Sequence, residues 1–280
     1  MKKLFICVLA VSFFGMAEAQ VKTPQPSLFT EVEQMVGLTE IEIEYSRPNK
    51  NGREIFGNLV PFDKIWRTGA NKNSTIEFKD DVTIEGQNVK KGKYAIFTKP
   101  GADSWEIYFY SDNENWGNPA KWEESKIVAK VNSKVNILPF TVESFTISLD
   151  DLTYNSAQLR ISWDNVMVET KIITPTDAKV QKSIDETLGG TPKSGDYIAA
   201  ANFYFSSGKD IQKAKEWMDQ GMKMNEKPAF YQIYQQALIH QKAGDKKSAL
   251  NLANQALESS KAAGSDDYVK LCTDLIQLLK

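Results

Sequence analysis

The sequence predicts two structural classes in one chain, an all-β antiparallel sandwich over residues 20–174 followed by a short all-α solenoid over residues 196–280. Apolar residues alternate with polar ones through most of the first part, whereas they recur every three or four positions in the second. The chain has 280 residues, which is enough for two domains that each bury their own core.

Residues 1–19 have the pattern of an export signal. Lys2 and Lys3 precede an apolar run over residues 4–14, and Ala17-Glu18-Ala19 offers the small residues that a signal peptidase accepts. The run is well short of the roughly 20 residues that span a bilayer, and no later segment is apolar enough to do so. We therefore expect an exported protein with no membrane span, located in the periplasm, with secretion as the alternative.

Strand patterns begin at residue 39, where Ile41, Ile43 and Tyr45 alternate with glutamates. Turn-forming sequences such as Lys99-Pro100-Gly101 separate the runs. About eight to ten short antiparallel strands follow, and two packed sheets bury their apolar faces, with a closed barrel as the alternative. The further runs lie at residues 76–78, 82–84, 95–97, 105–109, 127–131, 145–149, 159–163 and 166–168.

Residues 175–195 form the predicted linker. Asp177–Leu188 fits a short helix, and the glycine-rich segment 189–195 fits a loop or hinge because it has no apolar side chain to bury. Beyond the linker, alanine, leucine, methionine and lysine dominate, and the apolar residues follow a helical period. We therefore expect helices from residue 196 to the end of the chain.

The helical part repeats itself with an offset of 35 or 36 residues. Small residues at the repeated positions resemble those of a tetratricopeptide repeat, in which they let paired helices pack closely. The resemblance covers residues 196–280 and includes a last helix over residues 266–279 that can cap the stack. It implies a concave surface for a protein partner. The matched pairs are Gly208 with Gly244, Ala214 with Ala249, Met218 with Ala253 and Gly221 with Ala256.

Composition excludes several classes of function. The chain has 34 basic and 36 acidic residues, so it lacks the positive excess that a nucleic-acid-binding protein needs. One histidine, His240, and two cysteines are too few for a typical zinc site or a histidine triad. Because Cys7 lies within the export signal, Cys272 has no disulfide partner. We predict no catalytic residue, metal or cofactor, and expect His240 to be a helix-packing or surface residue and Cys272 to be buried.

The candidate ligand site lies in residues 45–71, where three arginines and one tryptophan gather with Asn71. Guanidinium groups offer planar sets of donors that suit carboxylate or phosphate. One interpretation is a pocket for a small anion or a sugar, in which the arginines and Asn71 donate hydrogen bonds and Trp66 forms a wall. The other, which we favour, is structural: Arg53 and Arg67 pair with internal acids such as Glu54 or Asp63, and Trp66 lies in the core. The candidate residues of this segment are Arg47, Arg53, Trp66, Arg67 and Asn71.

The strings Tyr45-Ser46-Arg47-Pro48 and Trp66-Arg67-Thr68-Gly69-Ala70-Asn71 carry a family resemblance. With Gly86, Gly92-Lys93-Tyr94, Pro100, Trp105 and Trp116-Gly117, they make residues 26–170 resemble the bacterial exported family called domain of unknown function 2911. The resemblance implies export and a shared fold. It implies no mechanism, because that family has no assigned activity.

A second polar cluster, residues 112–119, combines hard oxygen ligands with a tight turn, as a calcium loop requires. A plain turn is the alternative, which we favour because Trp116 stands where an EF-hand loop needs an oxygen. Trp116 and Trp122 flank the loop and are candidates for stacking on a sugar. Trp105 and Trp163 keep the phase of their strands, so we assign both to the core.

Taken together, these features predict a non-enzymatic binding or scaffold protein of the bacterial envelope. The sandwich binds a ligand or partner, and the helical repeats bind an envelope protein. Two alternatives stay open at this point. One is a hydrolase that uses carboxylates and has Arg53 and Arg67 stabilise developing negative charge. The other is a carbohydrate-binding module built on Trp66, Trp116 or Trp122, which requires two exposed indole faces on one surface.

Overall fold

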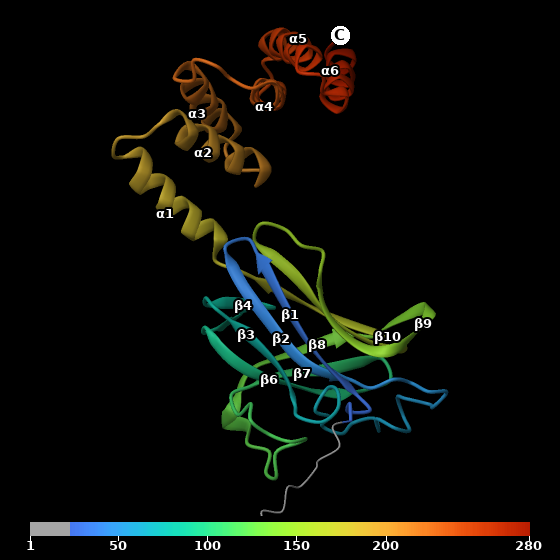
Figure 1. Cartoon of the computed structure of the whole chain (residues 1–280). Helices are drawn as coiled ribbons and strands as arrows, with labels where there is room; N and C mark the ends of the chain where they lie inside the picture. Colours follow the sequence, from blue (N-terminus) through green and yellow to red (C-terminus); the bar gives the residue numbers. More distant parts are fainter. Residues whose placement is uncertain (1–22) are drawn as a thin grey trace, which may run out of the picture.

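The computed structural model describes residues 23–280, so the expected export signal and Cys7 lie outside the described residues. Within this range ten β-strands precede six α-helices, and Figure 1 shows the strands gathered in one layered unit with the helices beyond it. The predicted class, an antiparallel β domain followed by an α-helical region, is confirmed.

The strands form two antiparallel sheets. The larger has the order β1-β2-β3-β6-β7-β8 and the smaller the order β5-β4-β10-β9. The strands of the larger sheet are β1 (Leu28–Val36), β2 (Thr39–Arg47), β3 (Ser74–Phe78), β6 (Gly92–Pro100), β7 (Ser104–Tyr110) and β8 (Ile127–Lys134). Those of the smaller sheet are β4 (Val82–Ile84), β5 (Gln87–Val89), β9 (Asn136–Asp150) and β10 (Ser156–Ile173).

One apolar core lies between the two sheets. Ile41 and Ile43 of the larger sheet and Ile147, Leu159 and Ile161 of the smaller are all buried in it. The alternation with glutamates on β2 works as expected, because each buried isoleucine is flanked by a partly exposed acidic residue. Complete burial of each such side chain stabilises the fold by about 1.5–3 kcal/mol. The shared core makes the β domain a sandwich.

The strands differ from the prediction in two places. The first strand, β1, precedes the predicted start at residue 39, because it is an edge strand whose apolar side chains are mostly exposed. The predicted runs 159–163 and 166–168 are parts of one long strand, β10. Between the two runs, around Asp164, the register of β10 with β9 shifts. Asp164 has a φ of 54°, as expected where the ladder bulges.

The linker begins with helix α1 (Thr176–Leu188), close to the predicted helix. This helix is tied to the sandwich, because the Leu38 backbone N–H donates to Thr176 Oγ1 at 3.2 Å. The Lys179 ammonium also donates to Asp80 at 2.7 Å and to the Leu38 carbonyl at 3.1 Å. Residues 189–193 then form the loop that leads into the next helix.

The remaining helices form two pairs and a last helix. The first pair packs Ala201 against Ala214 and Met218, and the second packs Ala237 against Ala249 and Ala253, so both lie in cores separate from that of the sandwich. Among residues 23–280, no helix has the length and apolar character to cross a bilayer. The helices are α2 (Ser194–Ser206), α3 (Ile211–Lys223), α4 (Phe230–Lys242), α5 (Lys246–Ala262) and α6 (Asp266–Leu279).

Candidate functional site

A cavity of about 410 Å³ opens at the end of the sandwich where the β2–β3 connection crosses it, and we call it the arginine cavity. Three of the six residues predicted for ligand binding line it, namely Arg53, Trp66 and Arg67. None of its lining residues is acidic. The full lining is Pro26, Ser27, Pro48, Asn49, Asn51, Arg53, Leu59, Val60, Trp66, Arg67, Gly69, Ala70 and Trp163.

The β2–β3 connection, residues 48–73, is irregular but held at both sides. Trp66 exchanges backbone hydrogen bonds with Thr98 of β6, at 2.7 and 3.0 Å. Near the start of the connection, the Pro48 carbonyl accepts from the Phe145 N–H at 2.9 Å, and the Lys50 N–H donates to Glu143 of β9 at 2.7 Å. Because both sheets fix it, the long connection can present side chains in defined positions.

Aromatic rings form the inner side of the arginine cavity. Trp66 is half-buried and stacks on Trp163, with ring centroids 6.0 Å apart and planes 16° apart. It also meets Trp105 and Phe145 edge to face, at 6.3 and 5.2 Å between centroids. Trp105 and Trp163 are only 1% and 2% exposed, so their predicted place in the core is confirmed.

The backbone of residues 68–71 is strained where it lines the cavity. Buried Thr68 has a φ of 57°, a conformation that a β-branched residue rarely adopts, and Asn71 has a φ of 59°. Hydrogen bonds hold Thr68 in this conformation, since its hydroxyl bonds to Thr98 Oγ1 at 3.0 Å and its carbonyl accepts from Ser74 Oγ. Backbone strain of this kind concentrates at functional sites.

Glycine is required at position 69. Its φ is 142°, and a Cβ there would lie 3.1 Å from the Ser46 carbonyl oxygen and 3.0 Å from Ser74 Oγ. In the described part of the chain, the backbone N–H groups of Gly69 and Ala70 make no hydrogen bond, although both residues line the cavity. Consecutive unpaired N–H groups in such a turn suit an anion.

Neither cavity arginine has an acidic partner within residues 23–280, so the predicted pairing with Glu54 or Asp63 is not observed. Arg53 is exposed and donates from Nε to the Lys50 carbonyl at 2.9 Å and from Nη2 to the Asn49 carbonyl. Those two bonds fix the side chain at the rim and leave Nη1 for another acceptor.

Arg67 is half-buried and joins the cavity to the neighbouring 112–118 loop. Its Nε is buried without a hydrogen-bond partner among the described residues. Its Nη1 lies 3.1 Å from the point that a Cβ on Gly117 would occupy, so that glycine leaves room for the guanidinium. A buried N–H of a cation without an acceptor is costly, which makes this residue a candidate for binding an anion.

Arg47 and Asn71 support the rim but do not line the arginine cavity. Arg47 donates from Nε to the Phe145 carbonyl at 3.0 Å and from Nη2 to Thr146 Oγ1 at 2.8 Å, which ties β2 to β9. The Asn71 amide donates to the Ser27 carbonyl and to Ser46 Oγ, both at 3.2 Å. These contacts position the segments from which the cavity is built.

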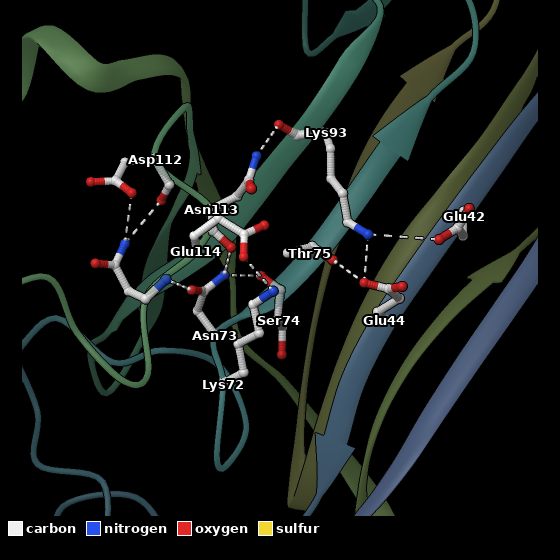
Figure 2. A network of polar contacts seen from close by, with 11 residues as sticks. Glu42, Glu44, Lys72, Asn73, Ser74, Thr75, Lys93, Asp112, Asn113 and Glu114 are labelled. Carbon is white, nitrogen blue, oxygen red and sulfur yellow. Dashed lines mark hydrogen bonds and ion pairs between the residues drawn. The ribbon is translucent and has the colours of Figure 1, made fainter.

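The loop over residues 112–119 uses its polar groups internally, as the plain-turn interpretation expects. Figure 2 shows Asn113 donating to the Lys93 carbonyl at 2.6 Å, while Asn73 bonds to the loop backbone. The Asp112 carboxylate accepts from Asn115 at 3.1 Å and from Lys126 at 3.0 Å. The loop oxygens are therefore committed to the loop and to its neighbours.

The tryptophans named for sugar stacking do not form a common face. Trp116 is 75% exposed, but it does not line the arginine cavity. Trp122 stacks on Tyr110 with centroids 4.6 Å apart and also meets Phe97, so its ring serves a second apolar cluster. Trp66 packs against the core. Sugar stacking needs two exposed indole faces on one surface, and Trp66, Trp116 and Trp122 do not provide them.

Sequence reasoning missed a charged cluster on β1 and β2, where carboxylate oxygens of Glu31, Glu42 and Glu44 lie within 4.8 Å of one another. Figure 2 shows Lys93 between two of them, 2.5 Å from Glu44 and 3.8 Å from Glu42. Burial raises the pKa of Glu42. The alternating glutamates were visible, but the pairing of Glu31 with Glu44 needs the β1–β2 register.

His240 belongs to a polar cluster in the helices, which we call the histidine cluster. Its ring is buried, and Nε2 lies 2.7 Å from Asp219 while Nδ1 lies 3.1 Å from Asp245. Lys215 and Gln236 also donate to Asp219, at 2.9 and 2.8 Å. The predicted packing role of His240 agrees with this geometry. Cys272 is fully buried, as predicted.

Comparison with known proteins places the chain in a family without adding an activity. No curated protein and no solved structure matches it. A family model described as a protein of unknown function (DUF2911) matches residues 27–172, which include the whole lining of the arginine cavity except Pro26. Because the match covers more than half of the chain, this chain is a member of the DUF2911 family.

Proposed function

We propose that this is an exported binding protein whose sandwich holds a small anionic ligand in the arginine cavity. One observation carries the proposal. Two of the chain's four arginines line a cavity that contains no acidic side chain, and neither has a carboxylate partner among residues 23–280. Two arginines in a lining that contains no carboxylate favour an anion.

The other groups of the lining support the same ligand class. The unpaired N–H groups of Gly69 and Ala70 supply donors, and the amides of Asn49 and Asn51 stand at the rim beside Arg53. Trp66 adds an apolar wall. A cavity of about 410 Å³ is within the usual range for small organic ligands, so a carboxylate or phosphate on a small organic body suits it.

A hydrolase has less support, because general acid–base catalysis needs a titratable group beside the substrate. The cavity lining supplies no carboxylate and no histidine. A sugar-binding module also has less support, because Trp116 is the one fully exposed indole of the three named for it. We therefore propose binding rather than catalysis.

We further propose that the helices bind a protein of the bacterial envelope in the manner of tetratricopeptide-like repeats. The equivalent positions of α3 and α5 support this, because Ala214, Met218, Ala249, Ala253 and Ala256 are all fully buried between helices.

Expression in a bacterial host tests whether the chain is exported. The periplasmic chain should begin at Gln20, and an uncleaved cytoplasmic chain would contradict export.

Thermal unfolding of the purified chain tests the anion site, with acetate, hexanoate, phosphate and sulfate compared at constant ionic strength. A ligand at 100 times its Kd adds about 2.7 kcal/mol and raises Tm by about 5 °C or more. Arg53→Ala and Arg67→Ala should abolish that shift. Arg160→Gln is the control, because its guanidinium pairs with three carboxylates away from the cavity and the shift should persist. If no anion raises Tm, the proposal is wrong.

A further inference from the structure

A second cavity of about 430 Å³ adjoins the arginine cavity at the start of strand β1, and we call it the β1 cavity. The two cavities share Pro26 and Asn49 in their linings, so they are neighbours with these residues between them. The β1 cavity is lined by Pro26, Leu28, Phe29, Thr30, Arg47, Asn49 and Ser144, and none of these residues is acidic.

One large apolar side chain lies at the β1 cavity without a role in the core. Leu28 is 61% exposed and is paired with Arg47 in the β1–β2 register, so these two side chains lie on the same face of the sheet. Phe29, the next residue of the strand, projects from the opposite face. Leu28 neither belongs to the sandwich core nor packs against it, so together with Pro26 it offers an apolar surface to a ligand.

The charge of the β1 cavity is fixed in place. The Arg47 guanidinium is anchored to the Phe145 carbonyl and to Thr146 Oγ1, and it pairs with no carboxylate in residues 23–280. An anionic ligand would therefore meet guanidinium groups at both ends of the rim, at Arg53 and at Arg47, with the Glu143 carboxylate beside Asn51 as an acidic neighbour. A cationic amphiphile would be repelled by the same guanidinium groups.

We infer that the ligand is an amphiphilic monocarboxylate with an alkyl chain. Its carboxylate occupies the arginine cavity near Arg53 and the N–H groups of Gly69 and Ala70. Its chain crosses Pro26 and lies against Leu28 in the β1 cavity. This inference rests on the proposed anion site and adds the chemical class of the ligand.

The inference predicts a dependence of affinity on chain length. Burial of one methylene lowers Kd by about fourfold, and a half-buried methylene lowers it by about twofold. A carboxylate confined to the arginine cavity would bind with the same Kd whatever its chain. Lengthening the chain by four methylenes, from hexanoate to decanoate, should therefore lower Kd at least tenfold.

Calorimetric titration of the full purified chain with acetate, hexanoate and decanoate measures this dependence, with decylammonium as the probe of opposite charge. Leu28→Ser should reduce the hexanoate-to-decanoate ratio below threefold while leaving the hexanoate Kd within twofold. Leu28→Asn should act in the same direction, so that a folding defect in one variant does not decide the result. Phe29→Ser should leave the ratio unchanged, because the Phe29 side chain projects from the opposite face of β1. Phe140→Ser is the matched control, because Phe140 is 61% exposed on β9 but lines neither cavity.

The possible results separate the inference from the proposed function. Equal Kd values for hexanoate and decanoate would overturn the amphiphile and leave the anion site in place. Binding of decylammonium as tight as that of decanoate would overturn it too, because the head group would then not be recognised. Loss of the chain-length effect in Phe140→Ser would overturn the placement of the chain. Absence of binding by every anion would overturn both proposals.

Discussion

Among the described residues, the charged groups of the arginine cavity lack partners of opposite charge, whereas those of the histidine cluster contact one another. At the cavity, Arg53 and Arg67 lie beside open space without an acidic partner in the described chain. In the histidine cluster, buried His240 lies between Asp219 and Asp245. The first arrangement leaves donors for a ligand, whereas the second uses each polar group to join helices α3, α4 and α5.

Backbone geometry separates the two regions in the same way. Thr68 and Asn71, which flank the lining residues Gly69 and Ala70, have left-handed backbones that cost free energy. Helix α5, by contrast, begins at an ordinary cap, where the Asp245 side chain accepts from the Ser248 N–H at 3.1 Å. Under the proposed function, charge in the helices stabilises the fold, while charge at the end of the sandwich is available to a ligand. Four predictions test this difference, from the largest expected effect to the smallest.

Replacing His240 with alanine should lower the free energy of unfolding of the helical region by about 3 kcal/mol, because the carboxylates of Asp219 and Asp245 lose their contacts with the buried imidazole ring. Urea unfolding followed by circular dichroism at 222 nm measures the loss. Gln241→Ala is the control, because the Gln241 side chain makes no hydrogen bond in the described structure. A loss below about 0.5 kcal/mol in His240→Ala would mean that the cluster does not stabilise the helices.

Replacing Gly69 with alanine should cost about 2 kcal/mol and abolish anion binding, because a Cβ meets the Ser46 carbonyl and the φ of 142° disfavours a side chain. Gly52→Ala is a matched control, since Gly52 also has a positive φ, 69°, but open space around its Cβ position. That variant should lose about 1 kcal/mol. Tryptophan fluorescence during urea unfolding measures both, because five of the six tryptophans lie in the sandwich.

The stability of the sandwich should fall in acid through Glu106 of β7. Hydrogen bonds from Lys130 and Tyr108 lower the pKa of Glu106 from 4.5 to about 2. Since the folded pKa is the lower one, its contribution is complete above pH 4.5 and is lost as the pH falls towards 2. We expect a loss of about 2 kcal/mol after allowing for solvent screening. Urea unfolding at pH 6 and pH 3 should show a smaller difference for Glu106→Gln, and an unchanged difference would contradict this assignment.

The smallest effect compares two arginines. Arg160→Gln should lower stability by about 1 kcal/mol, because Asp150, Asp151 and Glu169 lose their shared counter-charge. Arg53→Gln should change it by less than about 0.5 kcal/mol, because exposed Arg53 has no ion pair to lose in the described chain. Equal losses in the two variants would make Arg53 a structural anchor. Thermal unfolding without added ligand provides the measurement.

Periodicity was enough to predict the class of each half. Ile41, Ile43 and Tyr45 are buried as their alternation predicts, and the small residues of α3 and α5 are buried at the predicted repeat. Strand β1 was missed because an edge strand exposes its apolar side chains, so Phe29 and Met35 carry no burial signal. The extent of β10 was missed because a bulge at Asp164 interrupts the alternation.

The candidate site was predicted in composition but not in detail. Arg53, Trp66 and Arg67 were identified because arginine and tryptophan rarely gather by chance in one irregular segment. Arg47 and Asn71 belong to the same segment, but their hydrogen bonds to β9 and to Ser27 depend on which strands meet across the sandwich. The unpaired N–H groups of Gly69 and Ala70 follow from backbone angles that residue types alone do not specify.

The most direct test of an anion site is a nuclear magnetic resonance titration of the isotope-labelled chain with hexanoate. We predict that the backbone amide resonances of Gly69 and Ala70 shift most, because their N–H groups gain an acceptor on binding. Resonances of the histidine cluster should not move. If those two amides stay unchanged at saturation, or if the largest shifts lie in the helices, the central claim is contradicted.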